Sequence, residues 1–157
     1  MVIKNNDIII LYHYCNYNVS LYIMNYIIES VFVGCYTVCI YLIISSFLKN
    51  LYIVLLVCGF IKHFVGSYIG LWSWYCNNGE ACKKVLKGIY KSNNKCLIQD
   101  SINESIIFLL IGTLLSFIIK NNICLYLLLG AILHILGEKM GIHKTFCEKN
   151  CEKYRNN

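Results

Sequence analysis

The chain of 157 residues is 58% hydrophobic and 14% charged, contains no proline and carries a formal net charge of +6. A soluble domain is about 45–50% apolar and about 25% charged, and a chain this short could not bury so many apolar runs within its own core. The composition therefore excludes an ordinary soluble domain and predicts an integral membrane protein.

Residues 1–26 are predicted to form an interfacial or loosely ordered segment. Asparagine and histidine side chains interrupt the uncharged run of residues 8–28. A cleaved secretory signal is not favoured, because Lys4 is followed by no small-residue cleavage site. Two alternatives stay open: residues 8–28 form a fifth spanning helix, or translation begins at Met24.

The rest of the chain contains one pattern twice. The motif G-x3-H-x2-G-x3-G-x5-C begins at Gly59 and again at Gly130, a shift of 71 residues. With that shift, residues 29–76 align with residues 100–147 without a gap. Apolar segments resemble one another easily, but polar and glycine anchors at fixed offsets indicate an internal duplication. The predicted segments are repeat 1 (27–76), a basic loop (77–99), repeat 2 (100–147) and a polar tail (148–157).

Each repeat is predicted to form a hairpin of two membrane-spanning helices. An acidic residue and a serine precede the first span, which suits a helix N-terminus, and Lys-Asn separates the two spans. A span of about 19 residues is about 28 Å long, close to the hydrocarbon thickness of about 30 Å. The runs lack the two-residue alternation of a barrel. The predicted fold is all-α: a four-helix membrane bundle of two tandem hairpins in parallel orientation.

The lysines favour one orientation in the membrane. Two spans per repeat place the N-terminus, the central loop and the tail on one face, which carries most of the lysines, while Lys49 and Lys120 mark the other. By the positive-inside rule the first face is cytosolic. The basic loop and tail are expected to meet anionic lipid and protein partners, and a homo-oligomer stays open. Nucleic acid is not favoured, because stacking aromatics do not alternate with the lysines.

The repeated glycines and histidine form one stripe on the second helix of each repeat. Their spacing of 4, 3 and 4 residues places them on a single helical face. A G-x3-G pair allows close approach of helices in lipid, so we expect the second and fourth spans to pack along these stripes. The predicted packing glycines are Gly59, Gly66, Gly70, Gly130, Gly137 and Gly141.

His63 and His134 are the candidate cofactor ligands. Both lie at the same distance from the lysine of their turn, so they share one depth in the membrane. An ionisable group in a span is a functional candidate. The alternatives are a hydrogen bond to a neighbouring helix, a haem or metal held between two facing imidazoles, and a proton relay. Lys62 is expected to extend its side chain to the interface.

Of the ten cysteines, four lie in or near the spans and six, including Cys15 and Cys96, fall on the face predicted to be cytosolic. Those in or near the spans, Cys35, Cys39, Cys58 and Cys124, are expected to be free thiols. The other candidates, for a metal site or for disulfides, are Cys76, Cys82, Cys147 and Cys151. Their spacing is not the C-x2-C of a zinc knuckle, so thiols, two disulfides or a shared zinc site stay open. Common catalytic motifs are missing, which disfavours an enzyme.

The stretches KHFVGSYIGLWSWYCNNGEAC and LHILGEKMGIHKTFC resemble small multi-pass membrane proteins of giant DNA viruses. The resemblance covers the two His–Gly–Cys blocks; it implies a virus-encoded membrane or virion protein and no catalytic residue. The sequence favours a non-enzymatic structural or assembly component of a membrane. One alternative is a small membrane redox or cofactor-binding protein with haem or zinc at the histidine pair. A second is a small-ion transporter or channel.

Overall fold

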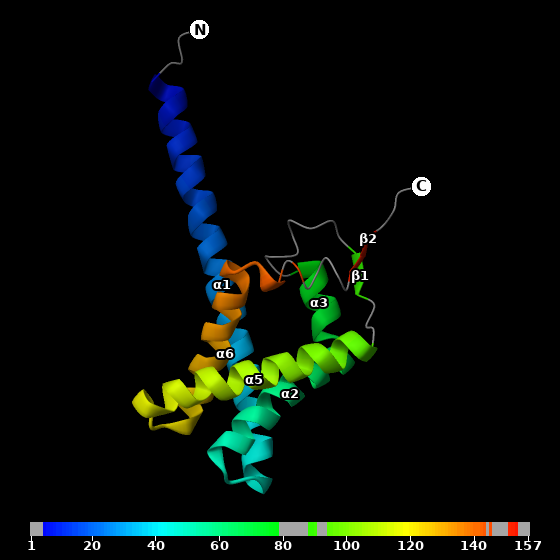
Figure 1. Cartoon of the computed structure of the whole chain (residues 1–157). Coiled ribbons are helices and arrows are strands. Elements are labelled where there is room, and N and C mark those ends of the chain that lie inside the picture. Colours follow the sequence, from blue (N-terminus) through cyan, green and yellow to red (C-terminus); the bar gives the residue numbers. More distant parts are fainter. Residues whose placement is uncertain (1–4, 79–87, 91–93, 144, 146–150, 154–157) are drawn as a thin grey trace.

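The fold is dominated by four long helices. The computed structural model describes the backbone of residues 5–78, 88–90, 94–143, 145 and 151–153, and the side chains of residues 26–72, 74, 75, 97–143 and 145. The elements are α1 (Asn5–Phe47), α2 (Leu51–Tyr68), α3 (Leu71–Asn78), β1 (Gly88–Tyr90), α5 (Asn94–Ile118), α6 (Asn122–Lys139) and β2 (Cys151–Lys153) (Figure 1).

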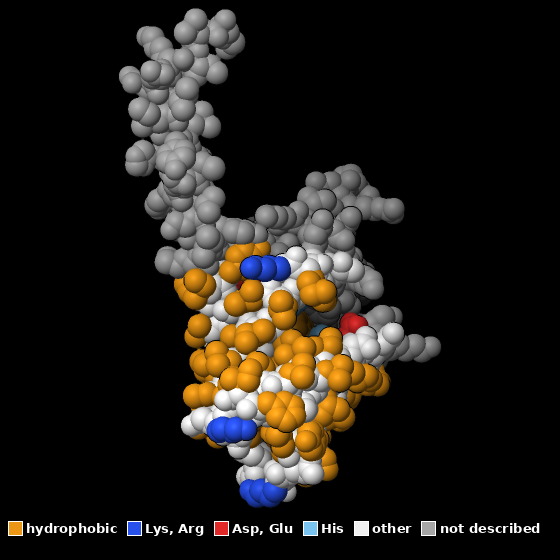
Figure 2. All heavy atoms as spheres, turned by 60° about the vertical axis from the view of Figure 1, so that its left-hand side comes forward, with side chains coloured by type: hydrophobic (Ala, Val, Ile, Leu, Met, Phe, Trp, Pro, Cys, Tyr) orange, Lys and Arg blue, Asp and Glu red, His pale blue; other side chains and the backbone are white. Residues whose placement is uncertain are grey.

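Each long helix contains a segment long and apolar enough to cross a membrane. These segments are Tyr26–Phe47, Leu51–Tyr68, Leu97–Ile118 and Asn122–Lys139. Figure 2 shows hydrophobic side chains over most of the described part of the face in view, with lysine side chains near its ends. Ile43, Leu114 and Phe117 are 65%, 62% and 69% exposed, which suits contact with lipid rather than water. The predicted helical architecture with four apolar segments of spanning length is confirmed.

The N-terminal residues belong to the first helix. α1 is 43 residues long and is helical from Asn5, whereas its candidate membrane span begins at Tyr26. No proline or glycine precedes Gly34, so nothing in the sequence breaks the helix before the span. The backbone of residues 5–25 is therefore a continuous helix rather than a loosely ordered segment, and its interfacial position stays a prediction.

The two turns between spans are closed by the same pair of residues. The Asn50 side chain accepts hydrogen bonds from two backbone amides in the first turn of α2, and Asn121 accepts one from α6. Lys49 and Lys120 donate from Nζ to carbonyls in the preceding helix, at 2.7 and 3.3 Å. Lys-Asn therefore ends one helix and caps the next, as expected of these residue types.

Two glycines that the sequence assigned to packing instead end helices. Gly70 and Gly141 have φ angles of 78° and 73°, and no atom lies within 4 Å of the position where a Cβ would stand. Each follows the C-cap residue of its helix, Ile69 in α2 and Met140 in α6. The left-handed conformation stops a helix, and glycine adopts it without steric cost. The second spans therefore end at these turns.

The spans pack crosswise between the two hairpins. α2 lies along α5 and α1 lies along α6, so the prediction that the second and fourth spans meet along their glycine stripes is wrong (Figure 1). A Cβ on Gly59 would come within 2.8 Å of the Cα of Ser105 and the Cβ of Phe108, both on α5. Gly130 lies in the same way against Thr37 of α1. Each glycine therefore allows the first span of the other hairpin to pack closely against its helix.

The hydrophobic core fills the half of the bundle nearer the Lys-Asn turns. Leu55, Phe108, Tyr126 and Leu129 are fully buried there. The ring of Tyr126 stacks on that of Tyr41 with centroids 4.2 Å apart. Because these large side chains fill this half, the remaining open space lies toward the other ends of the helices.

A short antiparallel pairing joins the central loop to the C-terminal tail. β1 pairs with β2, with Gly88 opposite Lys153 and Tyr90 opposite Cys151. The sequence predicts this loop and tail as separate polar segments. The pairing places parts of both at the same end of the bundle.

Candidate functional site

An open cavity of about 1220 Å³ lies between the two hairpins, at the end away from the Lys-Asn turns. Its walls come from α1, α2, α3, α5, α6 and the segment that follows α6. Most of the lining is apolar, with a few ionisable groups, as in many small-ligand sites. These groups are Glu29, Lys62, His63, Asp100, Glu104, His134 and His143.

The first ionisable cluster joins α2 to α5. Lys62 Nζ forms an ion pair with Glu104 Oε1, and His63 Nδ1 lies 2.8 Å from Glu104 Oε2. The Lys62 side chain is only 9% exposed, so the prediction that it extends to the interface is wrong. A carboxylate on the adjacent helix offers a nearer partner, and the pair reduces the cost of a charge within a span.

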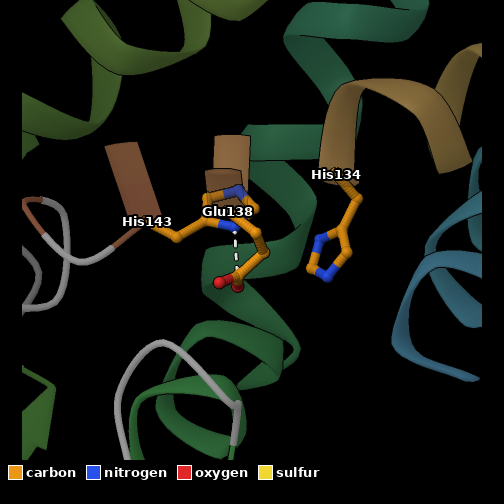
Figure 3. Close-up of side chains that lie close together, drawn as sticks. All are labelled: His134, Glu138 and His143. Carbon is orange, nitrogen blue, oxygen red and sulfur yellow. Dashed lines mark hydrogen bonds and ion pairs between the residues drawn. The ribbon is translucent and has the colours of Figure 1, made fainter. Parts of the chain in front are cut away.

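The second cluster lies on α6 and the turn beyond it. His143 Nδ1 is 3.0 Å from Glu138 Oε1, and the Tyr75 hydroxyl donates a hydrogen bond to the same carboxylate. His134 precedes Glu138 by one helical turn. Figure 3 shows His134, Glu138 and His143 close together, and one ligand atom from each lies within 4.8 Å of the other two.

The two histidines predicted as a ligand pair line the same cavity, but each has its own carboxylate. His63 pairs with Glu104, whereas His134 Nε2 lies 3.5 Å from Glu29 Oε2 on α1. Both imidazoles are buried. A haem or metal shared between His63 and His134 stays a prediction.

Each of these histidines also packs against a ring from the turn after its helix. The centroids of His63 and Trp72 are 4.6 Å apart with planes at 40°. Those of His134 and His143 are 4.8 Å apart with planes at 41°. Trp72 and His143 are equivalent positions under the shift of 71 residues. The two halves therefore build the same local arrangement with different side chains.

Gly66 and Gly137 make room for those rings. A Cβ on Gly66 would come within 3.1 Å of the Trp72 indole, and one on Gly137 within 2.8 Å of the His143 imidazole. These glycines were predicted to bring helices together. In the structure they let the side chain of the following turn fold back over the helix end, beside the cavity.

The cysteines of the spans are free thiols, as predicted. Cys58 is buried, and Cys35, Cys39 and Cys124 are exposed. The prediction of a metal site or disulfides at the other four lies outside the described side chains. Cys76 and Cys151 are placed by backbone alone, in α3 and β2, and Cys82 and Cys147 lie outside the described residues.

The partners in the site that were not predicted from the sequence include Glu29, Glu104, Glu138, His143 and Tyr75. Glu138 carries a local signal, because it follows His134 by four residues and so shares its helical face. Glu104 and Tyr75 carry none, since they lie 42 and 63 positions from the residues that they contact, Lys62 and Glu138.

The charge balance of the cavity favours cations. Its described lining contains three carboxylates (Glu29, Asp100 and Glu104) and one lysine, a formal charge of −2 with neutral histidines. A cavity walled by low-dielectric side chains concentrates counter-ions, and carboxylate and imidazole groups can bind them. The arrangement is chemically suited to holding a small cation.

No protein-family model, curated protein or solved structure matches this chain.

Proposed function

We propose that the protein is a multi-pass membrane protein that binds a small cation in the cavity between its hairpins, as a small-ion transporter does. The observation that carries this proposal is a cavity of about 1220 Å³ whose described lining has an excess of carboxylates. Ionisable residues within spans are costly and typically mark ion pathways. The structural or assembly role that the sequence alone favours stays a prediction.

We also propose that the hairpins are tandem repeats in parallel orientation. The proposal is supported by contacts that recur at the shift of 71 residues. Gly59 lies against Ser105 and Phe108, and Gly130 lies against Gly34 and Thr37, the corresponding positions. In transporters built from parallel repeats the substrate site lies at the interface between repeats, where this cavity lies.

A cytosolic position for the termini and the central loop remains our proposal for the orientation. It is supported by the lysine distribution, and the pairing of β1 with β2 agrees with a common face for loop and tail. The cavity then lies nearer the cytosol. The basic loop and tail are the proposed surface for anionic lipid and protein partners. That the protein is a virus-encoded membrane or virion protein stays a proposal, supported by the resemblance of the two His–Gly–Cys blocks alone.

Uptake of cations into proteoliposomes tests the transport proposal, with radioactive rubidium and zinc as monovalent and divalent probes. We expect uptake of at least one probe above that of empty liposomes. Glu29→Gln combined with Asp100→Asn should lower this uptake about tenfold, equivalent to about 1.4 kcal/mol of lost binding. The two carboxylates are equivalent positions of the two repeats and line the cavity.

The matched control is Lys49→Gln combined with Lys120→Gln, another equivalent pair, at the opposite end of the spans. Uptake by this variant should equal that of the wild type, because neither lysine lines the cavity. Uptake no greater than that of empty liposomes for both probes would reject the transporter and favour the structural or assembly role.

The redox alternative predicts a haem at His63 and His134, and the absorption spectrum before and after dithionite tests it. We expect tyrosine and tryptophan bands alone, because each imidazole lies beside its own carboxylate and packs against its own neighbouring ring. A Soret band that shifts on reduction and is lost in His63→Ala would establish haem ligation and displace the transporter proposal.

A further inference from the structure

We propose that His134, Glu138 and His143 form a binding site for one transition-metal ion, with zinc as the best-fitting case. The inference rests on the proposed cation-binding function and names the cation, but it does not require that the ion cross the membrane. One ligand atom from each residue lies within 4.8 Å of the others, beside the cavity wall (Figure 3).

The spacing of the ligand atoms suits a tetrahedral ion. Zinc binds nitrogen and oxygen at about 2.0–2.1 Å, which places neighbouring ligand atoms about 3.3 Å apart. His143 Nδ1 and Glu138 Oε1 are 3.0 Å apart. The wider separations, up to 4.8 Å, can close by rotation of the His134 imidazole about its side-chain bonds.

The donor types select the class of metal. Two imidazoles and one carboxylate form a ligand set that zinc uses when it keeps a fourth position for water or substrate. Magnesium and calcium prefer oxygen ligands alone, and copper(I) prefers sulfur. A fourth position facing the cavity would let the ion enter and leave.

The buried charge of Glu138 is the strongest argument for a cation. Its side chain is 3% exposed, and in the part of the chain that the structure describes no Lys or Arg forms an ion pair with it. The first cluster differs, because Lys62 compensates the charge of Glu104. Leu133 stands at the position equivalent to Lys62, so the second half lacks that lysine. A metal ion supplies the missing positive charge.

Tyr75 is the positioning residue of the proposed site. Its hydroxyl donates to Glu138 and lies 3.1 Å from His143 Nδ1, so it orients two of the three ligands from α3. Groups that hold metal ligands in place typically change affinity by about 10-fold to 100-fold when they are removed. We expect Tyr75→Phe to weaken zinc binding about tenfold.

The equivalent positions of the first half carry a different set of side chains. Trp72 stands where the second half has His143, and Ser67 stands where it has Glu138. His63 and Trp72 reproduce the geometry of the His134–His143 pair without the full ligand set. The equivalent turn of the first half therefore lacks two of the three proposed ligands.

Zinc titration of the reduced, detergent-purified full chain tests the inference. The wild type should bind one more equivalent of zinc than Glu138→Gln combined with His143→Ala, and each single change should weaken that site about a hundredfold. Lys49→Gln combined with Lys120→Gln, at the opposite end of the spans, should bind as the wild type does, because neither lysine lines the cavity. Comparing the melting temperatures of all variants without metal separates loss of ligands from loss of fold.

Cobalt distinguishes this site from the cysteines. Thiolate ligands give a sulfur-to-cobalt charge-transfer band in the near ultraviolet, whereas nitrogen and oxygen ligands give only weak visible bands. The difference spectrum between the wild type and the double variant should contain visible bands alone. Equal zinc content of both proteins, or a thiolate band in that difference, would overturn the site. Zinc binding without uptake would reject transport alone, and uptake without this zinc equivalent would reject the site alone.

Discussion

Glu104→Val should lower the free energy of unfolding by about 3 kcal/mol, since removing one member of a buried ion pair leaves an uncompensated charge. That charge is Lys62, whose side chain is 9% exposed and also lies 5.3 Å from the centroid of the Phe108 ring. His63 loses the same carboxylate. Unfolding of the purified protein in increasing SDS, followed by circular dichroism, measures the change.

The control for this prediction removes both charges. Lys62→Leu combined with Glu104→Val installs the residues of the equivalent positions, Leu133 and Val33. Replacing a buried ion pair by apolar residues of similar volume is often close to neutral, so the double variant should return to within about 1 kcal/mol of the wild type. A double variant less stable than Glu104→Val would show that Lys62 is not the source of the loss.

Gly59→Ala should lower the free energy of unfolding by about 2–3 kcal/mol, because the added methyl group disturbs the contact between α2 and α5. The added Cβ would stand 2.8 Å from the Cα of Ser105, which is backbone and cannot move aside without separating α2 from α5. The Ser105 hydroxyl donates to the Leu56 carbonyl at 2.7 Å, and this bond would break with the separation. The same SDS titration measures the loss of stability.

Gly112→Ala is the matched control for that helix contact. Its nearest neighbours are methyl groups of Leu55 and Leu129, at the ends of flexible side chains that can change rotamer. We expect a loss of about 1 kcal/mol or less, because alanine also favours the helix. Equal losses for the two variants would mean that Gly59 does not set the distance between α2 and α5.

The local parts of this fold are readable from the sequence. Apolar runs of spanning length predicted the four spans, and Lys-Asn marked both turns, which Asn50 and Asn121 cap. These signals are local: a run of apolar side chains and a polar side chain that satisfies the first amides of a helix. The prediction that the cysteines of the spans are free thiols rested on a local signal as well, their position within apolar runs.

The contacts between helices were not readable in that way. A glycine stripe indicates a close contact but does not identify the neighbouring group. Gly59 packs against α5, whereas Gly66 packs against the Trp72 ring. Gly70 and Gly141 fitted two interpretations, helix packing and helix termination, since glycine is also the usual residue just beyond a helix end. The Lys62 side chain could extend to the membrane interface or pair with Glu104. Which of the two occurs depends on which helix lies beside α2, and a single sequence does not show this.

The crosswise pairing makes each hairpin an incomplete unit during synthesis. α1 leaves the ribosome before α2 and α5, whereas its main partner, α6, follows them. Until α6 is inserted, the surface of α1 around Gly34 and Thr37 faces lipid. The surface of α2 around Gly59 is exposed in the same way until α5 is inserted. Contacts so distant in sequence form late and leave surfaces open in the meantime. A chain that stops in the central loop would expose both surfaces together, and a second copy of itself could cover them.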